Sequence, residues 1–170
     1  MSAPEAQDPS GAPLPLDVRP VETDADWAAA RALRQRVFVE EQECPPEEEW
    51  DAHDWPEGRG GDCRHLIGTA SDETAPHEIV GVCRWRPVEI GGERWAKLER
   101  FAVAPEARGH GYGRALVTAA LADARTHGHS RFILYAQDHL RAFYQSWGFS
   151  TSGDVFWEAG LPHVKMLLEG

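Results

Sequence analysis

Residues Glu106–Gly113 read Glu-Ala-Arg-Gly-His-Gly-Tyr-Gly, and they join a strand-like run, Lys97–Val103, to a helix-like run from Arg114 onward. Three glycines in five positions let the backbone turn tightly and come close to a ligand. A loop that ends at a helix N-terminus points unpaired N–H groups outward and carries a partial positive charge. The stretch therefore predicts an anion site, and a di- or triphosphate is the usual occupant of such a site.

The spacing of the glycines narrows the choice of phosphate ligand. A nucleotide-triphosphatase loop would need Gly-Lys followed by Ser or Thr, but Gly113 is followed by Arg114. A dinucleotide fold would need Gly-x-Gly-x-x-Gly early in a parallel β-α-β unit. The observed pattern resembles the acyl-CoA loop of the GNAT superfamily of N-acetyltransferases, Arg/Gln-x-x-Gly-x-Gly/Ala, whose three places are filled by Arg108, Gly111 and Gly113. A glycine-rich turn that only connects a strand to a helix remains the alternative.

A second group of residues, later in the chain, also resembles the GNAT family. Its signature is an Asn or similar amide after a strand, then a helix that ends in Tyr-x-x-x-Gly-Phe. Here Gln137 stands where the family usually has Asn, and Tyr144 and Gly148–Phe149 match at the family spacing. The two motifs occur in the family order and together cover Trp95–Phe149.

The flanking sequence is similar to one bacterial branch of the family, called ElaA-like or YjcF-like. The segments that carry this similarity are Arg36–Gln42, Glu47–Asp54 and Gly160–Met166. The resemblance implies an α/β, GNAT-like acyl-CoA N-acyltransferase fold with a mixed, mostly antiparallel sheet flanked by helices. The order of periodic segments, a strand, helices, three strands, a helix, a strand, a helix and strands, independently indicates a mixed α/β sheet.

Local signals place several element ends. Thr23, with Asp26 three residues later, predicts a capping box at the start of the first helix. Gly91–Gly92 predicts a tight turn between antiparallel strands, and Gly128 predicts the end of the long helix. Residues 16–170 are expected to form a single domain, and the Pro-, Ala- and Ser-rich residues 1–15 a disordered tail.

Composition and charge exclude several classes of protein. The 170-residue chain has a net charge of −11, which argues against nucleic-acid binding and favours cationic partners, including amines. Acidity that only aids solubility is the alternative. No apolar run approaches the roughly 18 residues that span a bilayer, and Met1–Pro15 lacks the pattern of a secretory signal. We expect no membrane partner and a cytoplasmic location.

The three cysteines, Cys44, Cys63 and Cys83, are odd in number and irregular in spacing, so they predict no disulfide framework. Cys63 with His65 and other side chains could in principle hold zinc, but paired ligand spacings are missing. We expect no metal, and small, half-buried thiols.

The resemblance implies acetyl-CoA as the co-substrate and a set of residues that hold it. Backbone amides of the loop would bind the pyrophosphate, and main-chain groups of the preceding strand would pair with the pantetheine arm. Arg108 would add charge or brace the loop. The implied cofactor-binding residues are Phe101, Ala102, Val103, Arg108, Gly109, His110, Gly111, Tyr112, Gly113, Arg114, Gln137 and Tyr144. Gln137 would bind the pantetheine amide or start the following helix.

Three residues are candidates for catalysis. The family position of Tyr144 implies a phenol near the thioester sulfur, and a phenol can donate a proton to a thiolate at neutral pH. Glu99 precedes Phe101 and Val103 by steps of two, so strand alternation predicts one shared face, with Glu99 as the general base or as a partner of Arg84 or Arg100. His163, or a water chain without a strict base, is the competing assignment.

The predicted reaction is direct transfer of an acetyl group to a primary amine in a ternary complex. The acceptor, a small molecule or a peptide amine, is expected over an acidic, aromatic segment: Glu40, Glu41, Glu43, Glu47, Glu48, Glu49, Trp50, Asp51 and Trp55. A solvated charge run is the alternative for that segment. The alternative for the whole chain is a non-catalytic CoA-binding sensor or interaction module. Exposed sheet edges in this fold would also allow a homodimer.

Overall fold

The computed structural model describes residues 16–55, 61–72 and 75–170, so the predicted tail, residues 1–15, lies outside the described residues. The strands are β1 (Leu16–Pro20), β2 (Arg64–Asp72), β3 (Ala75–Ile90), β4 (Glu93–Val103), β5 (Arg131–Gln137), β6 (Ser150–Thr151), β7 (Phe156–Glu158) and β8 (Leu161–Glu169). The α-helices are α1 (Asp24–Arg34), α2 (Pro46–Glu49), α3 (Tyr112–Thr126) and α4 (Arg141–Gln145). A π-helix covers Gln35–Glu41, and short 3₁₀ turns cover Ala52–Asp54, Pro105–Ala107 and Asp138–Leu140.

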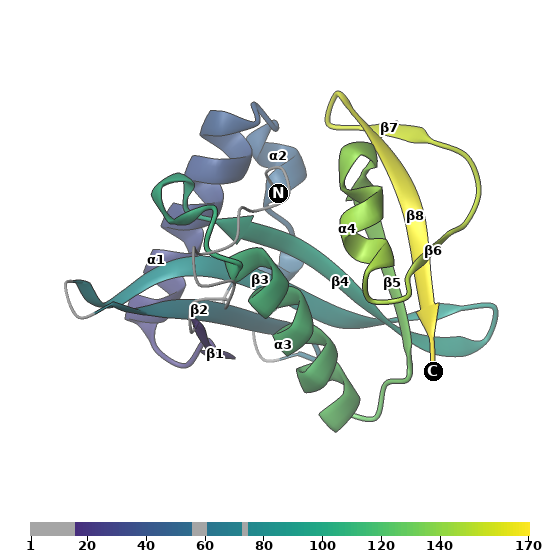
Figure 1. The fold of residues 1–170 in the computed structure, drawn as a ribbon, viewed down its shortest axis with the longest axis horizontal. Coiled ribbons are helices and arrows are strands. Elements are labelled where there is room, and N and C mark those ends of the chain that lie inside the picture. Colours follow the sequence, from purple (N-terminus) through teal and green to yellow (C-terminus); the bar gives the residue numbers. More distant parts are fainter. Residues whose placement is uncertain (1–15, 56–60, 73–74) are drawn as a thin grey trace.

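Within the described residues, eight strands form one sheet in the order β1-β2-β3-β4-β5-β8-β6, and β7 also pairs with β8. The β4–β5 ladder is parallel and the other ladders are antiparallel. Helices flank this sheet (Figure 1). The predicted mixed, mostly antiparallel sheet flanked by helices is confirmed.

The two faces of the sheet are covered by different helices, and β3 shows how one strand serves both. Trp85 lies on the α3 side, where its Nε1 donates a 2.7 Å hydrogen bond to Asp123. The neighbouring Arg84 points to the other face and binds Asp51 and Asp54, which follow α2. Side chains alternate along a strand, so adjacent residues of β3 reach opposite layers.

The predicted helix ends are confirmed in detail. Thr23 and Asp26 form the capping box of α1, with Thr23 Oγ1 accepting from the Asp26 amide at 3.1 Å. Gly128, with φ of +85°, follows the last turn of α3. The helix continues beyond Arg34 as the π-helix Gln35–Glu41, a change that the capping signals do not reveal.

Candidate active site

A cavity of about 380 Å³ lies where β4 and β5 separate. The two strands pair in parallel through Ala96 with Phe132 and Lys97 with Ile133, and beyond these pairs they diverge (Figure 1). The edge of β4 therefore faces open space, and an extended ligand can add to such an edge as a further strand. The lining residues are Phe38, Gln42, Cys44, Glu48, Glu49, Lys97, Leu98, Glu99, Arg100, Phe101, Leu134, Tyr135, Ala136, Gln137, Leu140, Tyr144, Glu158, Ala159, Leu161 and His163.

A β-bulge interrupts β4 at the cavity wall. Arg84 of β3 opposes Glu99, whereas Val82 opposes Ala102, so three steps along β4 match two along β3. Arg100 sits in this bulge with φ of +61°, and its guanidinium binds the Glu49 carboxylate at 3.0 Å. The register puts Ala102 on the face of Glu99, because directly opposed residues share a face. The prediction that Glu99, Phe101 and Val103 share one face is therefore wrong.

The glycine loop has the backbone geometry that its sequence predicts. Gly109 and Gly111 have φ of +84° and +78°, in the left-handed region that favours glycine, and Gly111 caps α3. Arg108 braces the loop: its Nε donates to the Val103 carbonyl at 3.2 Å, and its guanidinium pairs with Glu41 at 2.9 Å. Of the two roles considered for Arg108, the structure supports bracing.

The remaining loop side chains lie beside this backbone turn. Nδ1 of His110 lies 3.1 Å from the Ala107 carbonyl oxygen, and its ring stacks on Tyr112 at 5.6 Å between centroids. Arg114 is exposed, donates to Ser146 at 3.0 Å and lies over the Trp147 ring. The loop residues are outside the cavity lining, so a ligand that reached both would be long.

Tyr144 lies on the cavity wall within a cluster of aromatic rings. Its ring contacts Phe101, Phe143 and Phe149, with centroids 5.1 to 6.4 Å apart. Burial, with a smaller contribution from the Cys83 thiol, raises the pKa of Tyr144, so the phenol keeps its proton at neutral pH. This is the state that a proton donor needs.

Gln137 ends β5 at the cavity and precedes the 3₁₀ turn Asp138–Leu140. Its side-chain Nε2 donates to Gln42 Oε1 at 3.2 Å, and it makes no side-chain cap to the turn. Gln42, rather than the start of the helix, therefore holds the amide group of Gln137, which favours the role as a ligand to the cavity's occupant.

Glu99 is bound by cations on three sides. Its carboxylate lies 2.7 Å from Arg86, 3.1 Å from Arg84 and 3.2 Å from Lys97. Burial alone would raise its pKa, but these three positive charges outweigh burial and lower the pKa to about 2. Such a carboxylate holds protons weakly. The structure confirms pairing of Glu99 with Arg84 and disfavours Glu99 as a general base.

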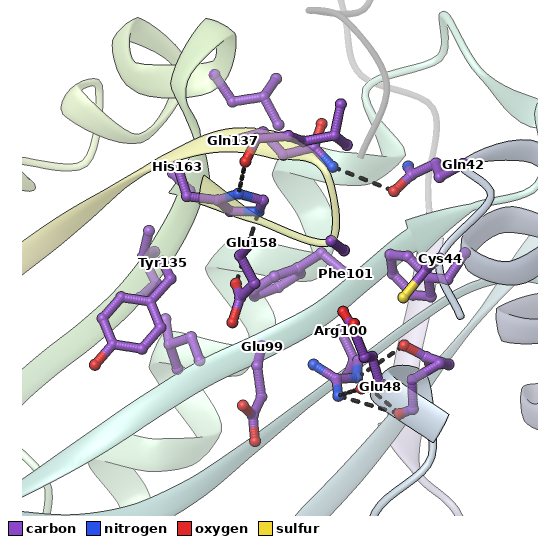
Figure 2. A pocket seen from close by; sticks show the side chains of 18 of the residues that line it. Gln42, Cys44, Glu48, Glu99, Arg100, Phe101, Tyr135, Gln137, Glu158 and His163 are labelled. Atoms are coloured by element: carbon purple, nitrogen blue, oxygen red, sulfur yellow. Dashed lines mark hydrogen bonds and ion pairs between the residues drawn. The ribbon is translucent and has the colours of Figure 1, made fainter. Parts of the chain in front are cut away.

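His163 reaches the cavity from β8, opposite Gln137 of β5. Its Nδ1 lies 2.9 Å from the Leu161 carbonyl oxygen, and its Nε2 lies 3.8 Å from a Glu158 carboxylate oxygen (Figure 2). Sequence reasoning missed Glu158, because only the pairing of β7 with β8 brings it beside His163. Cys44 and Tyr135 also line the cavity without having been predicted.

The buried members of the acidic segment are neutralised by arginines, and most of its other members lie outside the cavity. Buried Glu49 and Asp54 bind Arg34 at 2.6 and 2.5 Å, and Asp54 also binds Arg84 at 3.2 Å. Arg31 lies over both Trp50 and Trp55. Of the predicted acidic and aromatic residues, Glu48 and Glu49 line the cavity. The expected acidic, aromatic wall is therefore wrong for most of its members.

The described residues give no sign of a metal centre or of a membrane-crossing helix. Within them, no three His, Cys, Asp or Glu side chains are arranged to hold a metal, and Cys44, Cys63 and Cys83 are free thiols. Among their helices, none combines the length and the apolar character needed to traverse a bilayer.

Comparison with known proteins assigns the family. Residues 69–169 match the family model described as an acetyltransferase (GNAT) domain. The chain belongs to the GNAT family of acetyltransferases. The resemblance that the loop and the Tyr144 motif indicate is thereby confirmed.

Similar proteins cover nearly the whole chain. A Bacillus subtilis protein named as a candidate acetyltransferase is 34% identical over 151 residues, which are 89% of this chain and 95% of the relative. Escherichia coli ElaA is 29% identical with a TM-score of 0.75, over 91% of this chain and 99% of its own. A Brucella melitensis GNAT family acetyltransferase, solved in complex with acetyl-CoA, has a TM-score of 0.67 at 20% identity, over 91% of this chain and 87% of its own.

Proposed function

We propose that this GNAT protein transfers an acetyl group from acetyl-CoA to a primary amine by direct attack in a ternary complex. The observation that supports this proposal most strongly is the cavity between the diverging strands β4 and β5. Its walls include Phe101, Gln137, Tyr144 and His163. The glycine loop at the start of α3 lies outside it, where a diphosphate would bind. That the Brucella melitensis relative was solved with acetyl-CoA supports this choice of donor.

The side chains of the cavity can accept or donate each proton that the reaction transfers. His163 accepts one proton from the acceptor ammonium, and the resulting amine attacks the thioester carbonyl carbon to form a C–N bond. When the C–S bond breaks, Tyr144 donates its proton to the sulfur. The second N–H proton lost by the attacking nitrogen then restores the phenol. The products are the amide, free CoA and one proton released from His163 to solvent.

The competing proposal is a CoA-binding module without transfer. The arrangement of Tyr144 and His163 on the walls of one cavity favours the enzyme, because pure binding needs neither a proton donor nor an acceptor at the reacting atoms.

A thiol-release screen tests the proposed function. The protein would be incubated with acetyl-CoA and a panel of polyamines, amino sugars, amino acids and peptides, and free CoA would be measured with a thiol reagent. We expect amine-dependent CoA release with an equal amount of acetylated amine. Saturable CoA binding without release for any amine would favour the binding module.

A further inference from the structure

The β7–β8 hairpin supplies two neighbouring groups to the cavity. Glu158 is the last residue of β7, and the turn at Ala159 and Gly160, with φ of +47° and +76°, leads into β8. Glu158 opposes Leu161 across the hairpin, and His163 opposes Phe156, whose ring stacks on the imidazole at 5.9 Å. Because a short hairpin holds both side chains, their separation is set locally.

The hydrogen bond to the main chain fixes the tautomer of His163. A carbonyl oxygen can only accept, so Nδ1, 2.9 Å from the Leu161 oxygen, carries the proton. In the neutral imidazole, Nε2 then presents a lone pair. The Glu158 carboxylate oxygen, also an acceptor, lies 3.8 Å away. Two acceptors cannot hydrogen-bond to each other, and at this separation one donor group can reach both.

Four of the other charged groups of the cavity, Glu49, Lys97, Glu99 and Arg100, are already paired, whereas Arg100 contacts the exposed Glu48 only at its main-chain oxygen. Lys97 binds Glu99 at 3.2 Å and lies over the Tyr135 ring, and Arg100 binds Glu49 at 3.0 Å. Within the described part of the chain, the ion pair of Glu158 is with His163, and its side chain is 55% exposed. Glu158 therefore presents a negative charge that no lysine or arginine of the described chain neutralises.

We propose that Glu158 and Nε2 of His163 together bind the ammonium group of the acceptor, which makes the acceptor a cationic primary amine. An ammonium has three N–H donors and can bridge both acceptors. The adjoining Tyr135 and Phe156 rings, 5.5 Å apart, offer apolar surface to the carbon chain of the amine. Binding of the ammonium does not depend on catalysis, but its deprotonation rests on the proposed function. In that reaction the bound ammonium passes one proton to Nε2 of His163, and Glu158 is the positioning residue.

The test measures ammonium binding directly, apart from turnover. Butylamine, with butanol as its uncharged counterpart, would be titrated into the CoA-loaded protein and followed by ligand-observed NMR. We expect saturable binding of butylamine and none of butanol. Glu158→Gln should weaken butylamine binding about tenfold, as the loss of a charged hydrogen bond predicts, and Glu158→Asp should recover part of it. Glu158 is exposed, so these variants should fold.

Glu89→Gln is the matched control, because Glu89 is exposed and outside the cavity lining, and it should bind butylamine like the unaltered protein. Equal binding by Glu158→Gln and the unaltered protein, or no saturable binding by the latter, would overturn the inference. For any amine that is turned over, KM for the amine should rise in Glu158→Gln while KM for acetyl-CoA stays constant. Charge-dependent binding without CoA release would instead leave the ammonium site standing and reject the proposed function.

Discussion

Tyr144 is buried among aromatic rings, and that setting bears on its fitness as an acid. Burial raises the pKa of the phenol, which by itself weakens it as a proton donor. A thiolate that leaves beside these aromatic rings is desolvated as well, so its own pKa rises in the same direction. The proton transfer from Tyr144 to sulfur therefore stays feasible, because donor and acceptor shift together.

Tyr144→Phe removes the hydroxyl and keeps the packed ring. We expect kcat to fall by about 10²-fold, the usual contribution of a general acid, while CoA affinity changes little. Thiol release would give kcat, and titration calorimetry would give the affinity. A thermal-unfolding midpoint close to that of the unaltered protein would show that the ring still packs. Normal turnover would remove Tyr144 from the mechanism.

His65 makes the folded protein sensitive to mild acid. Burial lowers its pKa to about 4, whereas an unfolded histidine titrates near 6.5. As the pH falls below about 6.5, the unfolded chain takes up this proton first, so stability declines until about pH 4. At about 1.4 kcal/mol per pH unit, the loss over this window is about 3 kcal/mol.

Urea unfolding between pH 7 and pH 4 checks this prediction. The unfolding free energy should fall as the pH falls, and His65→Gln should make this fall smaller. The fall that remains comes from His129, whose pKa burial also lowers, and near pH 4 from carboxyls such as Glu99, whose pKa is lower in the folded chain. His139→Gln, at an exposed position, should keep the full slope. An unchanged slope in His65→Gln would contradict the assignment.

At the scale of elements, the two ends of α3 provide a matched test of the loop. Gly109 and Gly128 have nearly equal positive φ, +84° and +85°, and a Cβ at either would meet no atom within 4 Å. Alanine at each should therefore cost about 1 kcal/mol through backbone strain alone. Only Gly109→Ala should also weaken CoA binding in calorimetry, because Gly109 shapes the phosphate loop. Equal CoA affinity in both variants would argue against a phosphate at this loop.

The sequence predicts those elements whose signals are local. The capping box at Thr23, the glycine turn before α3 and the Gly91–Gly92 turn between antiparallel strands rest on neighbouring residues and are confirmed. The bulge at Arg100 depends on the register between β3 and β4, which alternation within one strand does not contain. Glu158 meets His163 only through hairpin pairing, so no spacing in the sequence indicated that contact.

Across the whole molecule, the net charge does not indicate which carboxylates are free to bind a ligand. The chain carries −11, yet Glu49, Asp54 and Glu99 are held by buried or half-buried arginines. A buried charge that loses its partner destabilises the folded protein. These carboxylates therefore hold the surrounding segments in place and are not free to bind a ligand. The carboxylate that lies beside His163 in the cavity is Glu158, far along the chain from the acidic segment that composition indicated.

The sheet divides into two parts that are joined at one end and separate toward the other. β1–β4 form one part and β5, β8, β6 and β7 the other, joined by the short β4–β5 ladder (Figure 1). In the proposed reaction, the open edge of β4 and the start of α3 bind the cofactor. Both belong to the first part, whereas Gln137, Tyr144 and His163 come from the second.

Hydrogen exchange with and without saturating CoA tests this arrangement most directly, because it reports which backbone amides the ligand covers. We expect slower exchange in residues 99–103 of β4 and residues 108–114 of the loop, with residues 16–20 of β1 unchanged. Protection confined to other segments, or none in these two despite saturation, would contradict it.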